Sequence, residues 1–136
     1  MTTNPNAALT NAELTRMVAE RQGWQVLAET YKGKSLYRWK SPDGKEARKG
    51  FNSADAAWHS VISITAYAGA ADAALTLLRE MNELDTWGTH YDLAYDRANK
   101  TWFIDSHMGG NQTADPKPER ACCLAWLAWK DARGTE

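Results

Sequence analysis

The segment 121–129 constrains the fold of this chain more than any other, because it consists only of apolar residues. It reads Ala-Cys-Cys-Leu-Ala-Trp-Leu-Ala-Trp, and Pro118 stands at the favoured first-turn position of a helix that we predict over 119–133. A helix that is apolar almost all the way round is buried on more than one side. Otherwise it presents Trp126 or Trp129 to a partner, so these two rings are candidate interface residues.

Local signals predict seven further elements along the chain. A first helix begins at a capping box formed by Thr10 and Glu13 and ends at Gly23. The other predicted elements are strands at 24–29 and 35–41, helices at 54–62 and about 70–83, and strands at 91–95 and 101–105. The order α-β-β-α-α-β-β-α predicts an α+β fold with one antiparallel sheet of about four strands and helices packed on it. The two αββα halves share too little sequence identity to establish a repeat.

Length and composition indicate one domain of ordinary globular character. A chain of 136 residues has the usual size of a single domain, so we expect a loose, flexible N-terminal arm at 1–8 and one α+β domain at 9–136. A net charge of −1 gives no overall attraction to nucleic acid or to an anionic membrane. The polar N-terminus, the absence of a long apolar run and the two free cysteines predict a cytoplasmic protein without a membrane association.

Four segments resemble the phage ABA sandwich domain family of small phage and prophage proteins. They are 18–24 (Val-Ala-Glu-Arg-Gln-Gly-Trp), 51–58 (Phe-Asn-Ser-Ala-Asp-Ala-Ala-Trp), 66–74 and 120–128, the last similar to a terminal Ala-x-Cys-x-Ala helix. The resemblance spans nearly the whole chain. It implies a three-layer α/β/α sandwich and a phage or prophage origin, and it brings no catalytic residues.

The segment 31–50 is the candidate site for a nucleotide or nucleic acid. Its net charge of +5 leaves about −6 for the rest of the chain, and Tyr31, Tyr37 and Trp39 are interleaved with the cations. Cations hold phosphates while aromatic rings stack on bases. The alternative is a solvated hairpin whose aromatic rings face the core. The seven basic residues are Lys32, Lys34, Arg38, Lys40, Lys45, Arg48 and Lys49.

Catalytic and metal-binding patterns are weak. Asp105, Ser106 and His107 are the residue types of a hydrolytic triad, but three consecutive residues of a strand point to alternate sides. His59, His90 and His107 lack the close spacing of zinc ligands. We therefore predict no catalytic residue, no metal and no cofactor.

The adjacent cysteines and one further tryptophan are the remaining candidates. The helix dipole could lower the pKa of Cys122 or Cys123 in the first turns of the last helix, but we favour core packing, with only one of the two pointing inward. Trp87 is hard to bury and is a third candidate interface residue, beside Trp126 and Trp129. The loop at 109–111 (Gly-Gly-Asn) could cradle an anion or simply form a long turn.

These patterns predict a protein that recognises rather than catalyses. We expect a non-enzymatic phage or prophage accessory protein that binds a host or phage protein, with counter-defence as one suitable role, or that forms a homodimer. The alternative is a protein that binds or sequesters a nucleotide or nucleic acid with the basic and aromatic hairpin at 31–50.

Overall fold

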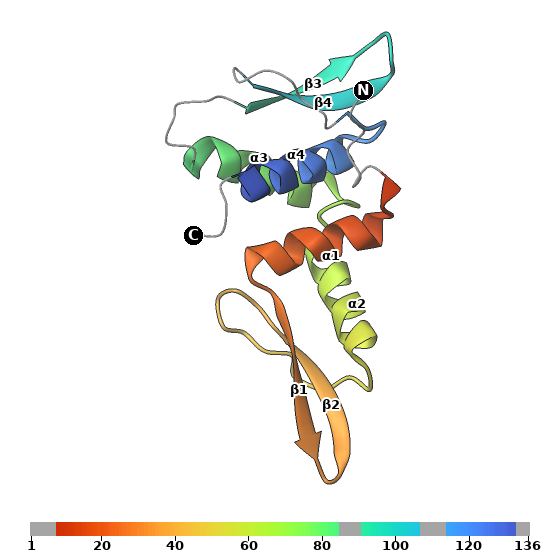
Figure 1. Ribbon diagram of the computed structural model, residues 1–136, viewed down its shortest axis with the longest axis vertical. Helices are drawn as coiled ribbons and strands as arrows, with labels where there is room; N and C mark the ends of the chain where they lie inside the picture. Colours follow the sequence, from red (N-terminus) through yellow and green to blue (C-terminus); the bar gives the residue numbers. More distant parts are fainter. Residues whose placement is uncertain (1–7, 85–90, 107–113, 133–136) are drawn as a thin grey trace.

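The computed structural model describes residues 8–84, 91–106 and 114–132 and confirms the predicted α+β class and order of elements (Figure 1). Local signals explain most element boundaries: Thr10 and Glu13 form both hydrogen bonds of the capping box, and Gly23 ends the first helix at φ 109°. The elements are α1 (Asn11–Gln22), β1 (Gln25–Tyr31), β2 (Lys34–Lys40), α2 (Ala54–Thr65), α3 (Ala71–Leu84), β3 (Tyr91–Asp96), β4 (Thr101–Ser106) and α4 (Pro118–Ala132).

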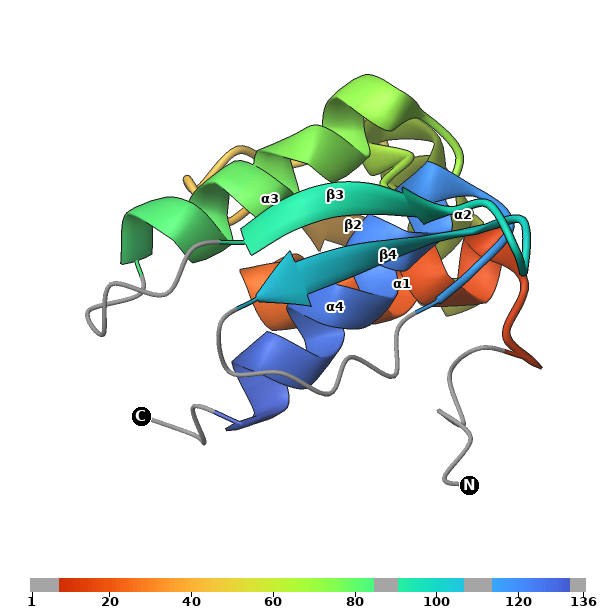
Figure 2. The same cartoon turned by 90° about the horizontal axis from the view of Figure 1, so that it is seen from above.

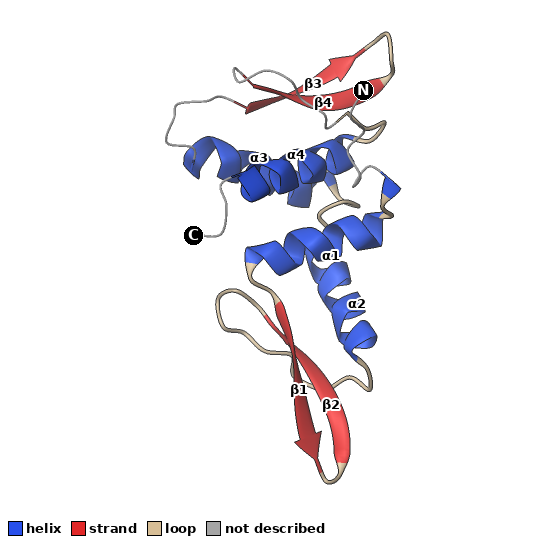
Figure 3. Ribbon diagram, in the orientation of Figure 1, coloured by secondary structure: helices blue, strands red, loops and turns tan. Residues whose placement is uncertain are grey.

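The strands form two separate hairpins, so the single sheet of about four strands is not what the described residues build. β1 pairs antiparallel with β2, and β3 pairs antiparallel with β4. Figures 1 and 3 show the hairpins at opposite ends of the long axis with the four helices between them, which is also not a three-layer sandwich. The physical reason lies in α4, whose apolar segment 121–129 is buried except at Ala128 and packs against α3, α1 and β4, so that the helix occupies the centre of the molecule in place of a shared sheet.

The two halves of the chain have the same topology. In each half a helix is followed by a hairpin, then by a return segment that pairs with the second strand, then by another helix. The return segments pair through Phe51 with Tyr37 and through Asp115 with Trp102, each with two reciprocal backbone hydrogen bonds. Both bridges lie three residues ahead of the following helix, α2 or α4. The structure therefore shows an internal repetition that sequence identity does not reveal.

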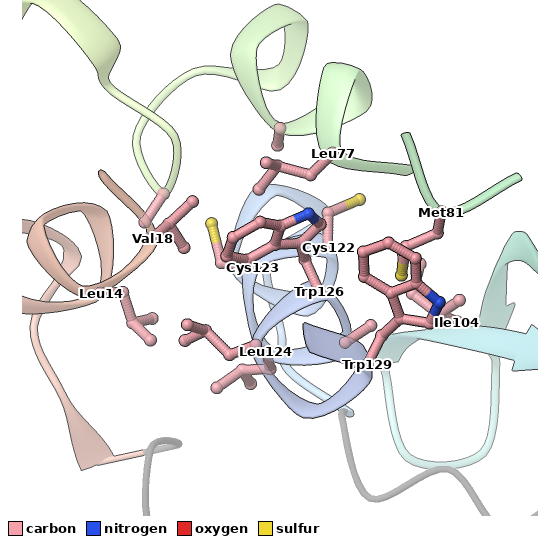
Figure 4. Close-up of a cluster of buried hydrophobic side chains, with 14 residues drawn as sticks. Leu14, Val18, Leu77, Met81, Ile104, Cys122, Cys123, Leu124, Trp126 and Trp129 are labelled. Carbon is pink, nitrogen blue, oxygen red and sulfur yellow. The ribbon is translucent and has the colours of Figure 1, made fainter. Parts of the chain in front are cut away.

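The main hydrophobic core surrounds α4, which packs against α3, α1 and β4 (Figure 4). Trp126 is completely buried and Trp129 is 9% exposed, so the prediction that either ring serves as an exposed interface anchor was wrong. Cys122 and Cys123 are also both buried, and not one alone as predicted. Because α4 has neighbours on three sides, more of its side chains are buried than if only one face of the helix were packed.

A smaller core lies between α1, α2 and the first hairpin. It contains the side chains of Ala19, Trp58 and Val61, with Trp24, Val26 and Trp39 packed against them. The ring nitrogen of Trp39 donates a hydrogen bond to Ser60 Oγ at 3.1 Å. These contacts fix which face of the β1–β2 hairpin meets the helices and which face is turned outward.

Candidate functional site: the outer face of the first hairpin

The β1–β2 hairpin has one face on the helices and one face in solvent, because successive strand residues point to opposite sides. Val26, Tyr37 and Trp39 share the inner face, as the ladder register and the packing of Val26 and Trp39 show. The opposite side, which we call the first outer face, consists of Gln25, Leu27, Glu29, Tyr31, Lys34, Leu36, Arg38 and Lys40.

Large apolar side chains are exposed on the first outer face. Leu27 is 41% exposed and Tyr31 is 62% exposed, and Leu36 beside them is half-buried. A single exposed leucine is ordinary on a protein surface, but neighbouring apolar groups with a polar border are typical of a binding surface.

A two-residue turn shapes the tip of this hairpin. Lys32 and Gly33 have positive φ angles of 49° and 77°, as a type I′ turn requires. The sequence predicts a connection at 32–34, which is one residue longer, because Lys34 is the first residue of β2. Lys32 Nζ lies 5.4 Å from the centroid of the Tyr31 ring. The tip therefore presents an aromatic ring and ammonium groups together.

The return segment after β2 adds cations beside the first outer face. It approaches β2 closely at Gly50, where a Cβ atom would lie 2.9 Å from Leu36 Cβ, so this position requires glycine or a shift of the neighbouring chain. Arg48 and Lys49 lie just before it and are exposed. Residues 25–51 carry seven basic and three acidic side chains, so this end of the molecule is positively charged.

The fold restrains the position of Arg38 on the first outer face. Its Nε lies 3.3 Å from Glu29 Oε2 as a Coulombic contact rather than an aligned hydrogen bond. Its Nη1 donates a weak hydrogen bond to the Ala47 carbonyl at 3.4 Å. The guanidinium is thus oriented while keeping donor capacity for an anionic group.

The structure brings the seven predicted basic residues together at one end of the molecule, but not with all three predicted rings. Tyr37 and Trp39 are turned to the inner face, so only Tyr31 accompanies the cations. Five of the cations are exposed and two are half-buried: Lys32, Lys34, Lys45, Arg48 and Lys49 belong to the first group, Arg38 and Lys40 to the second.

Sequence reasoning missed a second surface, on the β3–β4 hairpin. Leu93 and the buried Ile104 face the helices, so Ala94 and Phe103 point the other way, together with Asp92 and Asp105. The full set, which we call the second outer face, is Asp92, Ala94, Asp96, Thr101, Phe103 and Asp105. The sequence did contain a signal for this surface. Because side chains alternate along a strand, Phe103 falls on the same side of the hairpin as the aspartates.

The thiols of the two cysteines are less reactive than an ordinary exposed thiol. Burial raises the pKa of the Cys122 thiol to about 11, and the nearby Glu119 carboxylate adds to this effect. Burial, followed by the charge of Cys122, raises the pKa of Cys123 as well. Both thiols are therefore protonated at neutral pH and are poor nucleophiles.

We expect the thiols of the folded chain to react at pH 8 at least about a hundredfold more slowly with a chromogenic disulfide reagent than those of the chain in guanidinium, because the thiolate fraction falls tenfold for each unit that the pKa rises. The measurement is the time course of thiolate release, with the denatured chain as the control. The same raised pKa predicts stability that is complete below pH 9 and decreases as the pH rises toward 11. One thiol that reacts within seconds in the folded chain would refute this assignment.

The other predicted positions do not converge on a reactive centre in the part of the chain that the structure describes. Asp105 is exposed and His59 is an exposed residue of α2, while Trp87, His90, His107 and the loop at 109–111 lie outside the described residues. No group of three or more His, Cys, Asp or Glu side chains within 8–84, 91–106 and 114–132 is placed to hold a metal ion. Among the described helices, none is long and apolar enough to cross a membrane.

The fold and its two outer faces define an α+β protein built from two αββα units, with exposed hairpin faces. Comparisons with family models, with curated proteins and with solved structures find no match to this chain. The resemblance to the phage ABA sandwich domain family stays a prediction.

Proposed function

We propose that this chain is a non-enzymatic phage or prophage accessory protein that binds another protein through the first outer face. The observation that carries the proposal is the exposure of Leu27 and Tyr31 on the same face as Lys34 and Arg38. Protein interfaces combine an apolar centre, enriched in Tyr and Arg, with a polar rim, and this face has that composition.

The partner surface that fits this face has an apolar patch bordered by carboxylates. Arg38 is already oriented by Glu29 and loses little side-chain entropy when it binds a further carboxylate. The phage origin, a host or phage protein as partner and a counter-defence role rest on the family resemblance. The buried free thiols Cys122 and Cys123 support a reducing compartment, the host-cell cytoplasm.

A photo-crosslinking amino acid in place of Tyr31 tests the proposal in lysate from host cells with and without phage induction. We expect it to capture a discrete protein, because the ring at this position is 62% exposed at the tip end of the face, where a docked partner can reach it. The substitution Leu27→Ser in the same chain should lower the yield about tenfold, as expected for loss of a central apolar contact. The products are identified by mass spectrometry.

The matched control carries the same crosslinker at Arg79, an exposed residue of α3. It should not capture the same protein, and excess unlabelled chain should compete only with the product from position 31. Equal products from both positions, or no discrete product from position 31, would contradict the proposal.

Nucleic-acid binding is the second candidate function, and the cluster of exposed cations at 31–50 supports it. A projecting two-stranded ribbon also has the dimensions that the major groove of DNA accepts. The inward orientation of Tyr37 and Trp39 weighs against base stacking. Titration of labelled oligonucleotides with this chain separates the two functions. Salt-dependent binding that Lys34→Glu abolishes would favour nucleic acid, and flat titrations at low salt would exclude it.

A further inference from the structure

The outer half of the first hairpin projects beyond the helices (Figures 1 and 3). Residues 27–31 of β1 and residues 34–35 of β2 are all exposed, on both sides of the ladder. A hairpin of two strands is only marginally stable in water, and a third strand or a packed helix usually supports it. The return segment supplies such support to β2 through its bridge at Phe51, so β1 is the outer strand of this small sheet.

The backbone of β1 has an unpaired side. Tyr37 on β2 exchanges two backbone hydrogen bonds with Phe51, so its N–H and C=O groups point away from β1. The residue directly opposite such a position in an antiparallel ladder points its own groups outward too, and the direction alternates along the strand. Ala28 lies opposite Tyr37, and Thr30 lies two residues further on, so both direct an N–H and a C=O away from β2. Within the described ranges, no other segment hydrogen-bonds to these outward groups.

The second hairpin shows how the fold closes the corresponding edge in the other half of the chain. The side chain of Asn82 on α3 binds the backbone of Tyr91 on β3: its Oδ1 accepts from the Tyr91 N–H at 2.8 Å, and its Nδ2 donates to the Tyr91 carbonyl at 3.0 Å. Figure 2 shows β3 beside α3, which makes this contact possible. In the part of the chain that the structure describes, no side chain binds Ala28 or Thr30 in this way, so the fold leaves the edge of β1 open.

We propose that this open edge of β1 receives an extended segment of the partner protein as an added strand. The proposal rests on the proposed function, because it states how the partner of the first outer face is held. Main-chain hydrogen bonds to Ala28 and Thr30 supply affinity, and alternate side chains of the segment, lying beside Leu27 and Tyr31, supply specificity.

The charge of this end indicates which segment fits. Residues 25–51 carry seven basic and three acidic side chains, and Lys32 and Lys34 are exposed at the tip of the hairpin. A segment with apolar residues beside Leu27 and Tyr31 and with Asp or Glu toward the two lysines complements both features. A second copy of β1 would bring two positively charged ends together, and like charges across an interface lower affinity. An acidic and apolar segment of another protein therefore fits better than a second copy.

The substitution Ala28→Pro removes the donor of this edge and leaves the ladder intact. Because the Ala28 N–H points away from β2, proline at this position costs no β1–β2 hydrogen bond, and edge strands tolerate proline at such positions. Ala28→Thr keeps the N–H and is the matched control. Circular dichroism of both variants establishes that they are folded.

A displayed library of random peptides of about nine residues, the length of a long strand, is the probe, selected on the purified full chain. We expect the enriched peptides to combine apolar with acidic residues and to bind the wild type and Ala28→Thr equally. Ala28→Pro should weaken their binding at least about tenfold, because it leaves a carbonyl of the peptide without its donor. Fluorescence anisotropy of a labelled, enriched peptide measures the affinities.

Methylation of the peptide nitrogens, one at a time, tests the added strand on the wild-type chain alone. Every second residue of an added strand directs its N–H toward β1. Methylation should therefore abolish binding at every second position of the paired stretch and be tolerated at the positions between them. A peptide that docks through its side chains would not show this period of two.

Enriched peptides that bind Ala28→Pro as tightly as the wild type, or methylation losses without a period of two, would overturn the proposal. A library from which no peptide is enriched would overturn it too, as would dimerisation of the chain alone that Ala28→Pro abolishes. The crosslinker at position 31 separates this failure from failure of the proposed function. If the Ala28→Pro chain captures the same protein from lysate in the same yield, the proposed function stands without an added strand.

Discussion

Replacing Arg120 by alanine is expected to lower the free energy of unfolding by about 3–5 kcal/mol, the range for breaking a buried charge pair by removing one partner. Arg120 Nε donates to Asp115 Oδ2 at 3.0 Å, and the two side chains are only 12% and 7% exposed. The other guanidinium nitrogens donate to Asn11 Oδ1 at 2.7 Å and to the Leu9 carbonyl at 2.6 Å. One side chain thus connects the return segment after β4, the start of α4 and the start of α1.

Urea unfolding followed by circular dichroism measures this change, with Arg21→Ala as the matched control. Arg21 pairs with Asp131 at 2.9 Å, but both side chains are partly exposed, so its loss should cost about 1 kcal/mol or less. A loss below about 1 kcal/mol for Arg120→Ala would contradict the role assigned to the buried pair. The double variant with Asp115→Ala should cost less than the sum of the two single changes, since the two groups interact directly.

The substitution Trp126→Ala is expected to lower the free energy of unfolding by about 3–5 kcal/mol, because it opens a large cavity in the main core. Trp126 is completely buried, and its ring nitrogen donates a hydrogen bond of 2.7 Å to Glu80 Oε2. Gln22 Nε2 donates to the other oxygen of the same carboxylate at 3.1 Å. The ring therefore fills the core and also joins α4 to α3.

Two further variants separate these contributions in the same urea measurement. Trp126→Phe keeps most of the apolar contact but removes the donor, so we expect a smaller loss of about 1–3 kcal/mol for a weakened buried hydrogen bond. Leu75→Ala, at a site that is 46% exposed, is the control and should change stability little. If Trp126→Ala cost no more than Leu75→Ala, the ring would not occupy the core position described.

Part of the candidate site was predictable because its signals are local. The turn at Lys32 and Gly33 and the alternation within each strand depend on residues only a few positions apart. They suffice to place Lys32, Lys34, Arg38 and Lys40 on the β1–β2 hairpin, and the other three cations follow on the return segment that pairs with β2. The orientation of that hairpin was not predictable, since Trp39 turns inward because α1 and α2 offer an apolar surface to it, and Tyr37 shares its side of the ladder.

The second outer face was missed for the same reason. The sequence predicts that one side of β3 and β4 is buried, but Phe103 could have belonged to the core or to the surface. The packing of α4 decides which residue is buried. Its apolar residues pack with Ile104 in the main core, and Phe103 lies on the opposite side of the hairpin. Trp126 and Trp129 illustrate the reverse case, because these candidate interface residues are buried by α4's neighbours, α3, α1 and β4.

The sequence by itself determined the type and order of the elements, their capped ends and the concentration of positive charge at 31–50. These features follow from steric preferences and hydrogen bonds within a few residues, which act before any distant contact is made. Tertiary structure alone decided that the strands form two hairpins instead of one sheet, that both cysteines are buried and that oppositely charged faces stand at opposite ends. Those outcomes depend on which apolar surfaces cover one another, because burial of apolar surface stabilises a contact between two segments regardless of their distance in the chain.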